Sequence, residues 1–163
     1  MSIFNPEIII STLGKYHVRY VLIGALAARL QGFPRVTADI DITPAKDSEN
    51  LQNLATALIE LDARVFTESV PEGLVFDCTG ISLAKSEMWN LITSSGRIDI
   101  AFKPAGTLGY HDLMNNAVQY SVYGFQIFAA SLEDIIRSKK VSDRTQDRQD
   151  IIILNEILSK KNQ

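Results

Sequence analysis

Two aspartates separated by one residue are the side chains of this sequence best suited to do chemistry. Asp39-Ile40-Asp41 lies within Thr37 to Thr43, where carboxylates alternate with isoleucines as in a half-buried strand. Side chains two residues apart on an extended chain point the same way, so the two carboxylates share one face. Such a pair can bracket one or two magnesium ions. Because aspartate is depleted in strands, we interpret the pair as functional rather than as a solvated strand face.

A third aspartate repeats this pattern further along the chain. Asp99 stands between Ile98 and Ile100 in a second strand-like segment. If the strands that carry Asp41 and Asp99 are neighbours, three carboxylates converge. Two of them would bind metal, and the third would accept a proton or complete the metal shell. The convergence is an expectation about the tertiary structure.

A glycine turn upstream of the aspartate pair suggests a phosphate site. The run from Val18 to Ile23 is strand-like, Gly24 follows it, and helix-forming residues fill 25–30. Backbone amides at the start of a helix attract phosphate, and magnesium held by the aspartates would bridge the same phosphates. A glycine at such a turn can also serve the backbone angle alone. We therefore interpret the turn at Gly24 as a phosphate site only because Asp39 and Asp41 follow it in the sequence.

Apolar spacing, caps and turn residues predict the elements that must position these residues. We expect an α+β fold, with a mixed or antiparallel sheet flanked by helices and a helical carboxy terminus, as one domain over residues 1–163 because no linker or repeat divides the chain. The expected helices are 6–13, 25–30, 48–61, 111–117, 131 through about 141, and 146–158. The expected strands are 18–23, 37–43, 88–92, 98–102, 118–122 and 125–128. Segment 64–80 shows no periodic pattern, and we predict no element there.

Composition limits the class of protein. The 163 residues are 46% hydrophobic, which is enough to form a core without disulfides or a structural metal. The net charge of −3 argues against nonspecific binding along a nucleic acid. The lone cysteine, Cys78, cannot form an internal disulfide, which favours a reducing compartment. We find neither a secretory signal nor an apolar run of roughly 18 residues, so we expect a cytoplasmic protein without a membrane partner.

Several segments together resemble a known family. They are Gly24-Ala25, Arg35 to Asp41, Ile98-Asp99-Ile100, and Leu132 to Lys139 with Arg144, Asp147, Asp150 and Ile151. This set resembles the nucleotidyltransferase fold of the DNA polymerase beta superfamily. Within that superfamily it is most similar to small bacterial nucleotidyltransferases of the abortive-infection AbiEii toxin type.

The resemblance implies a role for each site residue. Asp39 and Asp41 would bind two Mg²⁺ ions, and Asp99 would be the third carboxylate, activating an acceptor hydroxyl. The backbone at Gly24 and Ala25 would face the β- and γ-phosphates of a nucleoside triphosphate. The basic residues assigned to the nucleotide are Lys139, Arg35 and Arg144.

The implied activity is magnesium-dependent transfer of a nucleoside monophosphate from a nucleoside triphosphate to a hydroxyl, with release of pyrophosphate. The acceptor stays open among tRNA, a protein and a small molecule. One alternative is a nucleotide- or partner-binding module without chemistry, because Ala25 offers no hydroxyl where many members have serine or a second glycine. Another is a toxin–antitoxin component with a cognate partner protein.

Basic residues recur near the helical repeat in the last two expected helices. They are Arg137, Lys140, Arg144 and Arg148, and Asp143, Asp147 and Asp150 interleave with them. Mixed charges of this kind are typical of a solvated helix face. We therefore interpret these charged residues as a solvated face, with the exception of Lys139 and Arg144.

Overall fold

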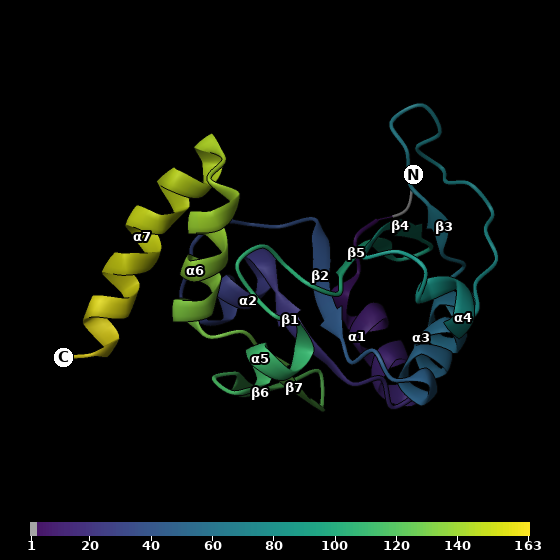
Figure 1. The fold of residues 1–163 in the computed structure, drawn as a ribbon, viewed down its shortest axis with the longest axis horizontal. Coiled ribbons are helices and arrows are strands. Elements are labelled where there is room, and N and C mark those ends of the chain that lie inside the picture. Colours follow the sequence, from purple (N-terminus) through teal and green to yellow (C-terminus); the bar gives the residue numbers. More distant parts are fainter. Residues whose placement is uncertain (1–2) are drawn as a thin grey trace.

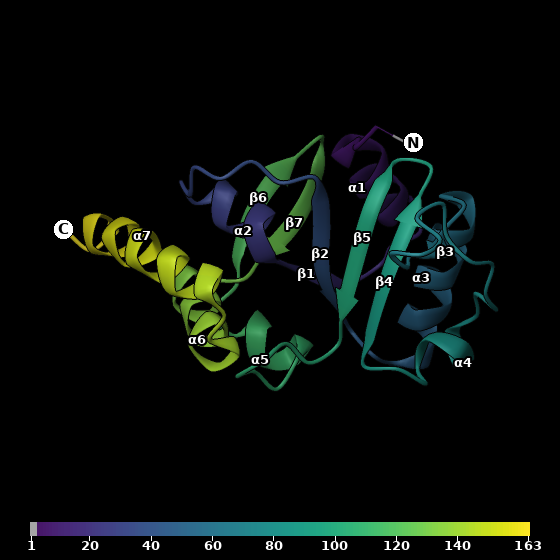
Figure 2. The same cartoon turned by 90° about the horizontal axis from the view of Figure 1, so that it is seen from above.

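A computed structural model describes residues 3–163, so the first two residues of the expected 1–163 domain lie outside the described part. Within it, seven strands form one sheet, in the order β3-β4-β5-β2-β1-β7-β6 (Figures 1 and 2). The strands are β1 (Tyr20–Ile23), β2 (Asp39–Pro44), β3 (Arg64–Val65), β4 (Met88–Thr93), β5 (Gly96–Ala101), β6 (Val118–Val122) and β7 (Phe125–Ala129). The expected α+β class is confirmed.

The sheet is mixed, and its centre carries the aspartates. β2 pairs antiparallel with β1, where Ile23 lies opposite Asp41, and parallel with β5, where Asp41 lies opposite Asp99. β1 also pairs in parallel with β7, while β3–β4, β4–β5 and β6–β7 are antiparallel. The two strands that carry the acidic residues are therefore direct neighbours, as expected.

Helices flank the sheet and extend past one end of it. They are α1 (Pro6–Lys15), α2 (Gly24–Leu30), α3 (Ser48–Glu60), α4 (Gly80–Leu83), α5 (Tyr110–Met114), α6 (Leu132–Ser142) and α7 (Thr145–Lys161). In Figure 1, α6 and α7 lie together at one end of the molecule, and α1, α3 and α4 lie at the other. None of the helices between residues 3 and 163 is both long and apolar enough to cross a bilayer.

Burial of the isoleucines fixes which face of β2 presents the aspartates. Ile40 and Ile42 are fully buried in the core that also includes Leu54 and Leu58 of α3. Since successive side chains of a strand point to opposite faces, Asp39 and Asp41 must lie on the other face. Burying two isoleucines stabilises the fold by roughly 2 kcal/mol each, so the hydrophobic pattern holds the carboxylates on their face.

Segment 64–80 contains a short strand that we did not predict, β3, and a second unpredicted element, α4, begins at its last residue. β3 has only two residues, and Val65 also forms a bridge with Leu74. Thr79 caps α4 by accepting a hydrogen bond from the Ser82 amide on its side-chain oxygen. A two-residue strand and a one-turn helix are too short to leave a periodic signal, and pairing with β4 is what fixes β3.

Candidate active site

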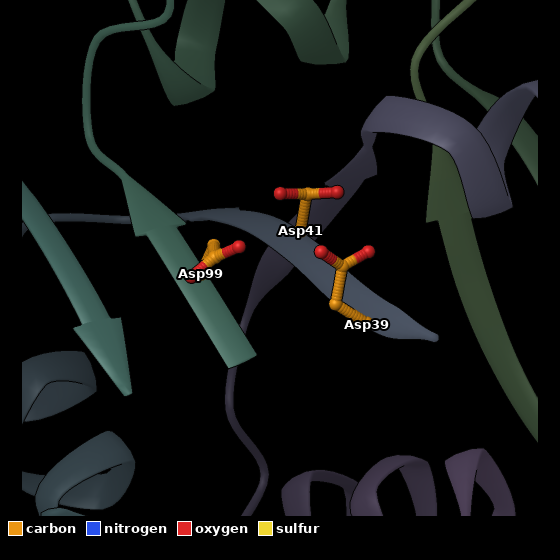
Figure 3. A group of neighbouring side chains, drawn as sticks. All are labelled: Asp39, Asp41 and Asp99. Atoms are coloured by element: carbon orange, nitrogen blue, oxygen red, sulfur yellow. The ribbon is translucent and has the colours of Figure 1, made fainter. Parts of the chain in front are cut away.

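Three carboxylates converge where β2 and β5 run side by side. Asp39, Asp41 and Asp99 each offer an oxygen atom, and these three atoms all lie within 4.8 Å of one another. Figure 3 shows the three side chains on the same side of the two strands. All are partly buried. An all-oxygen, triply acidic donor set of this size fits a hard divalent cation such as Mg²⁺.

Hydrogen bonds orient the two outer carboxylates. The Thr37 hydroxyl donates to Asp39 Oδ1 at 2.7 Å, and Arg97 Nη2 donates to Asp99 Oδ1 at 3.1 Å. Thr37 acts from the loop before β2, whereas Arg97 is two residues before Asp99 on the same face of β5. Both contacts leave the second oxygen of each carboxylate available to a ligand.

Burial and neighbouring negative charge raise the proton affinity of Asp41 and Asp99. Burial, followed by the charges of Asp39 and Asp99, raises the pKa of Asp41 to about 7. Burial also raises the pKa of Asp99, although Arg97 opposes that shift. In the metal-free protein Asp41 and Asp99 therefore resist ionisation, and a bound cation would favour their charged forms.

Replacing Asp41 should stabilise the metal-free protein above neutral pH. The folded state holds this proton up to about pH 7, whereas an unperturbed aspartate releases it near 3.8, so the native state loses stability as pH rises between these values. Three units correspond to about 4 kcal/mol, and partial exposure reduces this, so we expect Asp41→Asn to add about 1–3 kcal/mol at pH 8. Urea unfolding in EDTA at pH 8 and pH 4 measures the gain, which should vanish at pH 4.

Gly24 brings the chain into contact with the central carboxylate. Its φ is +69°, and a Cβ built there would lie 2.4 Å from Asp41 Oδ2. A side chain at this position would displace the carboxylate as well as strain the backbone. The glycine turn is therefore part of the metal site's geometry.

Gly24→Ala should weaken metal binding at least tenfold, because the methyl group and Asp41 Oδ2 cannot occupy the same space. Gly124→Ala is the matched control: Gly124 has φ +81°, but nothing lies within 4 Å of its Cβ position. Backbone strain at positive φ should lower the stability of both variants by at least about 1 kcal/mol. Titration of each variant with Mn²⁺, followed by electron paramagnetic resonance, separates the two effects. Equal metal affinity in the two variants would contradict the argument.

A cavity of about 640 Å³ lies over the carboxylates. It brings together all eight residues that the sequence singled out: Asp39, Asp41, Asp99, Gly24, Ala25, Arg35, Lys139 and Arg144. The acidic residues come from the sheet, and the basic residues come from α6, from the start of α7 and from the loop before β2. One wall of the cavity is thus suited to a metal and the other to an anion.

The three basic residues are held by two buried aspartates of α7. Lys139 Nζ lies 2.9 Å from Asp150 Oδ2 and 3.3 Å from Asp147 Oδ1. Arg35 also pairs with Asp150, and Arg144 Nε lies 2.9 Å from Asp147 Oδ2. We call Asp147 and Asp150 the ionic anchor. They tie α7 to α6 and to the loop before β2.

The prediction that the aspartates of this region lie on a solvated helix face is wrong for Asp147 and Asp150. Asp147 and Asp150 are only 1% exposed. Burial alone would raise the pKa of Asp147, but hydrogen bonds from Arg144 and Ser142 hold it well below its usual range. The prediction of a solvated face holds for Asp143 and Arg148, which form an exposed ion pair.

No protein-family model and no curated protein sequence matches this chain. Solved structures do match it. A lincosamide antibiotic adenylyltransferase, LnuA, bound to lincomycin, is 16% identical with a TM-score of 0.62, over 96% of this chain and 99% of that one. ANT(2'')-Ia in complex with adenylyl-2''-tobramycin is 16% identical with a TM-score of 0.58, over 94% and 87% of the two chains.

A candidate nucleotidyltransferase from Thermotoga maritima is 19% identical with a TM-score of 0.53, over 98% of this chain and 97% of that one. At these identities the likeness establishes the fold. The chain has the nucleotidyltransferase fold. The three structures cover nearly its whole length, so the likeness includes both the sheet and the helices around the cavity.

Two further cavity residues of this nucleotidyltransferase fold escaped the sequence analysis. Lys103 lines the cavity and, among the described residues, forms no ion pair with a carboxylate. It continues the alternation of Asp99 and Ala101, a signal that the sequence does contain. Asp134 also lines the cavity. It lies within the segment Leu132 to Lys139, near the start of an expected helix, but nothing in the sequence singled it out.

Proposed function

We propose that this protein is a metal-dependent nucleotidyltransferase that moves a nucleoside monophosphate from a nucleoside triphosphate to an acceptor hydroxyl and releases pyrophosphate. The observation that carries the proposal is the convergence of Asp39, Asp41 and Asp99 within 4.8 Å, at the floor of a cavity whose far wall is basic. The fold likeness to two antibiotic adenylyltransferases supports it.

The three carboxylates would have two different roles, metal binding and proton transfer. Asp39 and Asp41 would hold Mg²⁺, and bound magnesium would offset the charge that develops on the triphosphate. Asp99 Oδ1 already accepts from Arg97, so its Oδ2 would take the proton of the acceptor hydroxyl. The hydroxyl oxygen would form a bond to the α-phosphorus while the bond from that phosphorus to the bridging oxygen breaks and pyrophosphate leaves.

The acceptor that we favour is a small hydroxyl-bearing molecule. One similar structure contains lincomycin and another contains adenylyl-2''-tobramycin, so this fold accommodates small acceptors in those proteins. The narrower likeness to AbiEii-type toxins stays a prediction. Transfer RNA and a cognate partner protein are therefore alternative acceptors in the assay.

Incubation with each nucleoside triphosphate labelled at the α-phosphate, Mg²⁺ and the three acceptor classes tests the proposal. We expect label transfer and equimolar pyrophosphate, both abolished by EDTA. Triphosphate binding without pyrophosphate in any arm would instead support the binding module that Ala25 suggested. Absence of both binding and turnover would reject the proposal.

Lys103 should contribute to triphosphate binding. Among residues 3–163 it has no carboxylate partner, whereas Lys139, Arg35 and Arg144 each pair with an aspartate of the ionic anchor. Lys103→Ala should therefore raise KM for the triphosphate about tenfold, by loss of one charge-assisted contact. Steady-state kinetics measures this. Lys85→Ala removes an exposed lysine that does not line the cavity, and it should leave KM unchanged.

A further inference from the structure

The outer edge of β6 is an unprotected end of the sheet. Among the strands that the structure describes, β6 is last in the order and pairs with β7 alone, and Figure 1 shows this hairpin at the lower border of the molecule. The opposite edge, β3, has only two residues, whereas β6 has five, and none of the five is charged or a proline. Shortness, charge and proline are what usually keep an edge from pairing with another chain. The β6 edge is therefore able to add a strand.

The hairpin turn determines which backbone groups of β6 point outward. Both turn residues have positive φ, as in a type I′ turn, so the flanking pair Val122 and Phe125 exchanges two hydrogen bonds. Because bonded and non-bonded pairs alternate, Tyr120 also bonds to β7, whereas Gln119 and Ser121 direct their N–H and C=O groups away from it. The described part of the chain supplies no hydrogen-bond partner for these four groups.

The sequence of β6 is symmetric about Tyr120. Gln119 and Ser121 flank the tyrosine, and Val118 and Val122 flank this polar pair. An antiparallel copy, related by a twofold axis through Tyr120, would place valine opposite valine and Gln119 opposite Ser121. The outward backbone groups of the two strands would then bond each other. Both valines and the tyrosine share the face on which β7 is buried, so the pairing would also extend an apolar surface across the edge.

An exposed tyrosine and a groove complement each other in this arrangement. Tyr123 is 48% exposed and has φ +52°, at a turn position that favours asparagine, aspartate or glycine. Val118 lines a groove of about 440 Å³ together with Leu158 and Lys161 of α7. If Val118 lies opposite Val122 of a second copy, Tyr123 of that copy comes next to Val118. The groove is therefore placed to receive the side chain that the turn leaves exposed.

We infer that β6 pairs with β6 of a second copy of this chain, so that two copies form one continuous sheet with Tyr123 of each in the groove of the other. The occupant is a second copy because the strand is its own complement in sequence and in outward backbone groups. One strand and one tyrosine from each copy make an interface at the small end of the range, roughly 1,200 Å². The dimer should therefore be reversible, with a micromolar Kd. This inference is independent of the proposed nucleotidyl transfer.

Sedimentation velocity at protein concentrations from about 1 to 200 µM tests the dimer. We expect the native chain to pass from monomer to dimer within this range. Tyr123→Asn should raise Kd at least tenfold, because it removes the side chain that enters the groove. The same variant should keep or raise the midpoint of thermal unfolding at about 1 µM, because asparagine suits the turn. Val75→Asn changes another exposed apolar residue, in the loop between β3 and α4, and should leave Kd unchanged.

Cysteine cross-linking tests the twofold axis. In this register Tyr120 lies opposite Tyr120 of the second copy in a non-hydrogen-bonded pair, whose Cα atoms are about 4.5 Å apart, a separation that a disulfide can bridge. In a Cys78→Ser background, Tyr120→Cys should form a covalent dimer on mild oxidation. Gln126→Cys is the matched control, because Gln126 is exposed on β7, one strand in from the edge, and it should remain monomeric.

Each outcome bears on a different part of the inference. A native chain that stays monomeric at about 200 µM overturns it and leaves the edge to another occupant. A dimer that Tyr123→Asn leaves intact and that Tyr120→Cys does not cross-link uses another surface, which also overturns it. A weakened Tyr123→Asn dimer without the cross-link overturns the register, as does equal cross-linking through Gln126→Cys. A cross-link with an unchanged Kd in Tyr123→Asn overturns the placement of the tyrosine in the groove.

Discussion

Asp41→Asn should lower kcat for nucleotidyl transfer at least about a thousandfold, the equivalent of about 4 kcal/mol of transition-state stabilisation. Asp41 lies opposite Asp99 in the β2–β5 register and shares the metal cluster with Asp39. An amide keeps the size of the side chain and removes the charge that would hold the metal. Label transfer with saturating triphosphate and Mg²⁺ measures the loss.

Two observations would separate this result from misfolding. The metal-free variant should be more stable than the native protein at pH 8, as argued above from the raised pKa of Asp41. Asp77→Asn removes an exposed aspartate outside the cluster and should keep full activity. If Asp41→Asn kept a tenth of native activity or more, Asp41 would not be an essential metal ligand.

Asp150→Ala should lower the free energy of unfolding by about 3 kcal/mol, because it breaks a buried ionic contact from one side. Asp150 accepts from Lys139, Arg35 and Gln146, and its removal leaves two cations short of a partner. α7 should then separate more readily from α6 and from the loop before β2. Urea denaturation measures the change.

Asp143→Ala is the matched control for this prediction. Its pair with Arg148 is exposed on both sides, at 58% and 67%, so the substitution should cost much less stability than Asp150→Ala. Asp150→Asn keeps an acceptor oxygen and should fall between the two. Equal losses for Asp150→Ala and Asp143→Ala would show that the ionic anchor contributes no more than a surface pair.

The acidic cluster could be predicted because its signal is local. Alternation in Asp39 to Ile42 and around Asp99 indicates which face each side chain takes, whatever the partner strand is. The β6–β7 hairpin is also local: Tyr123 and Gly124 both have positive φ, as its two-residue turn requires. The position of these strands in the sheet was beyond local signals, since it depends on contacts between distant segments.

The ionic anchor shows why some features of the cavity could not be predicted from the sequence. Asp147 and Asp150 belong to a sequence of mixed charges that is typical of a solvated helix, yet both are buried. Asp150 pairs with Arg35, more than a hundred residues away. When a distant segment determines whether a residue is buried, the sequence around that residue shows no periodic pattern that predicts it.

The register of β2 between its two neighbours limits where this chain can change in length. One residue inserted within β2 would exchange the faces of every later side chain of the strand, placing isoleucine over the cavity and aspartate in the core. Insertions in segment 66–79, which connects β3 to α4, shift neither β2 nor β5. Natural or engineered length variants should therefore accumulate in that loop, and the strands that carry the carboxylates should keep their residue count.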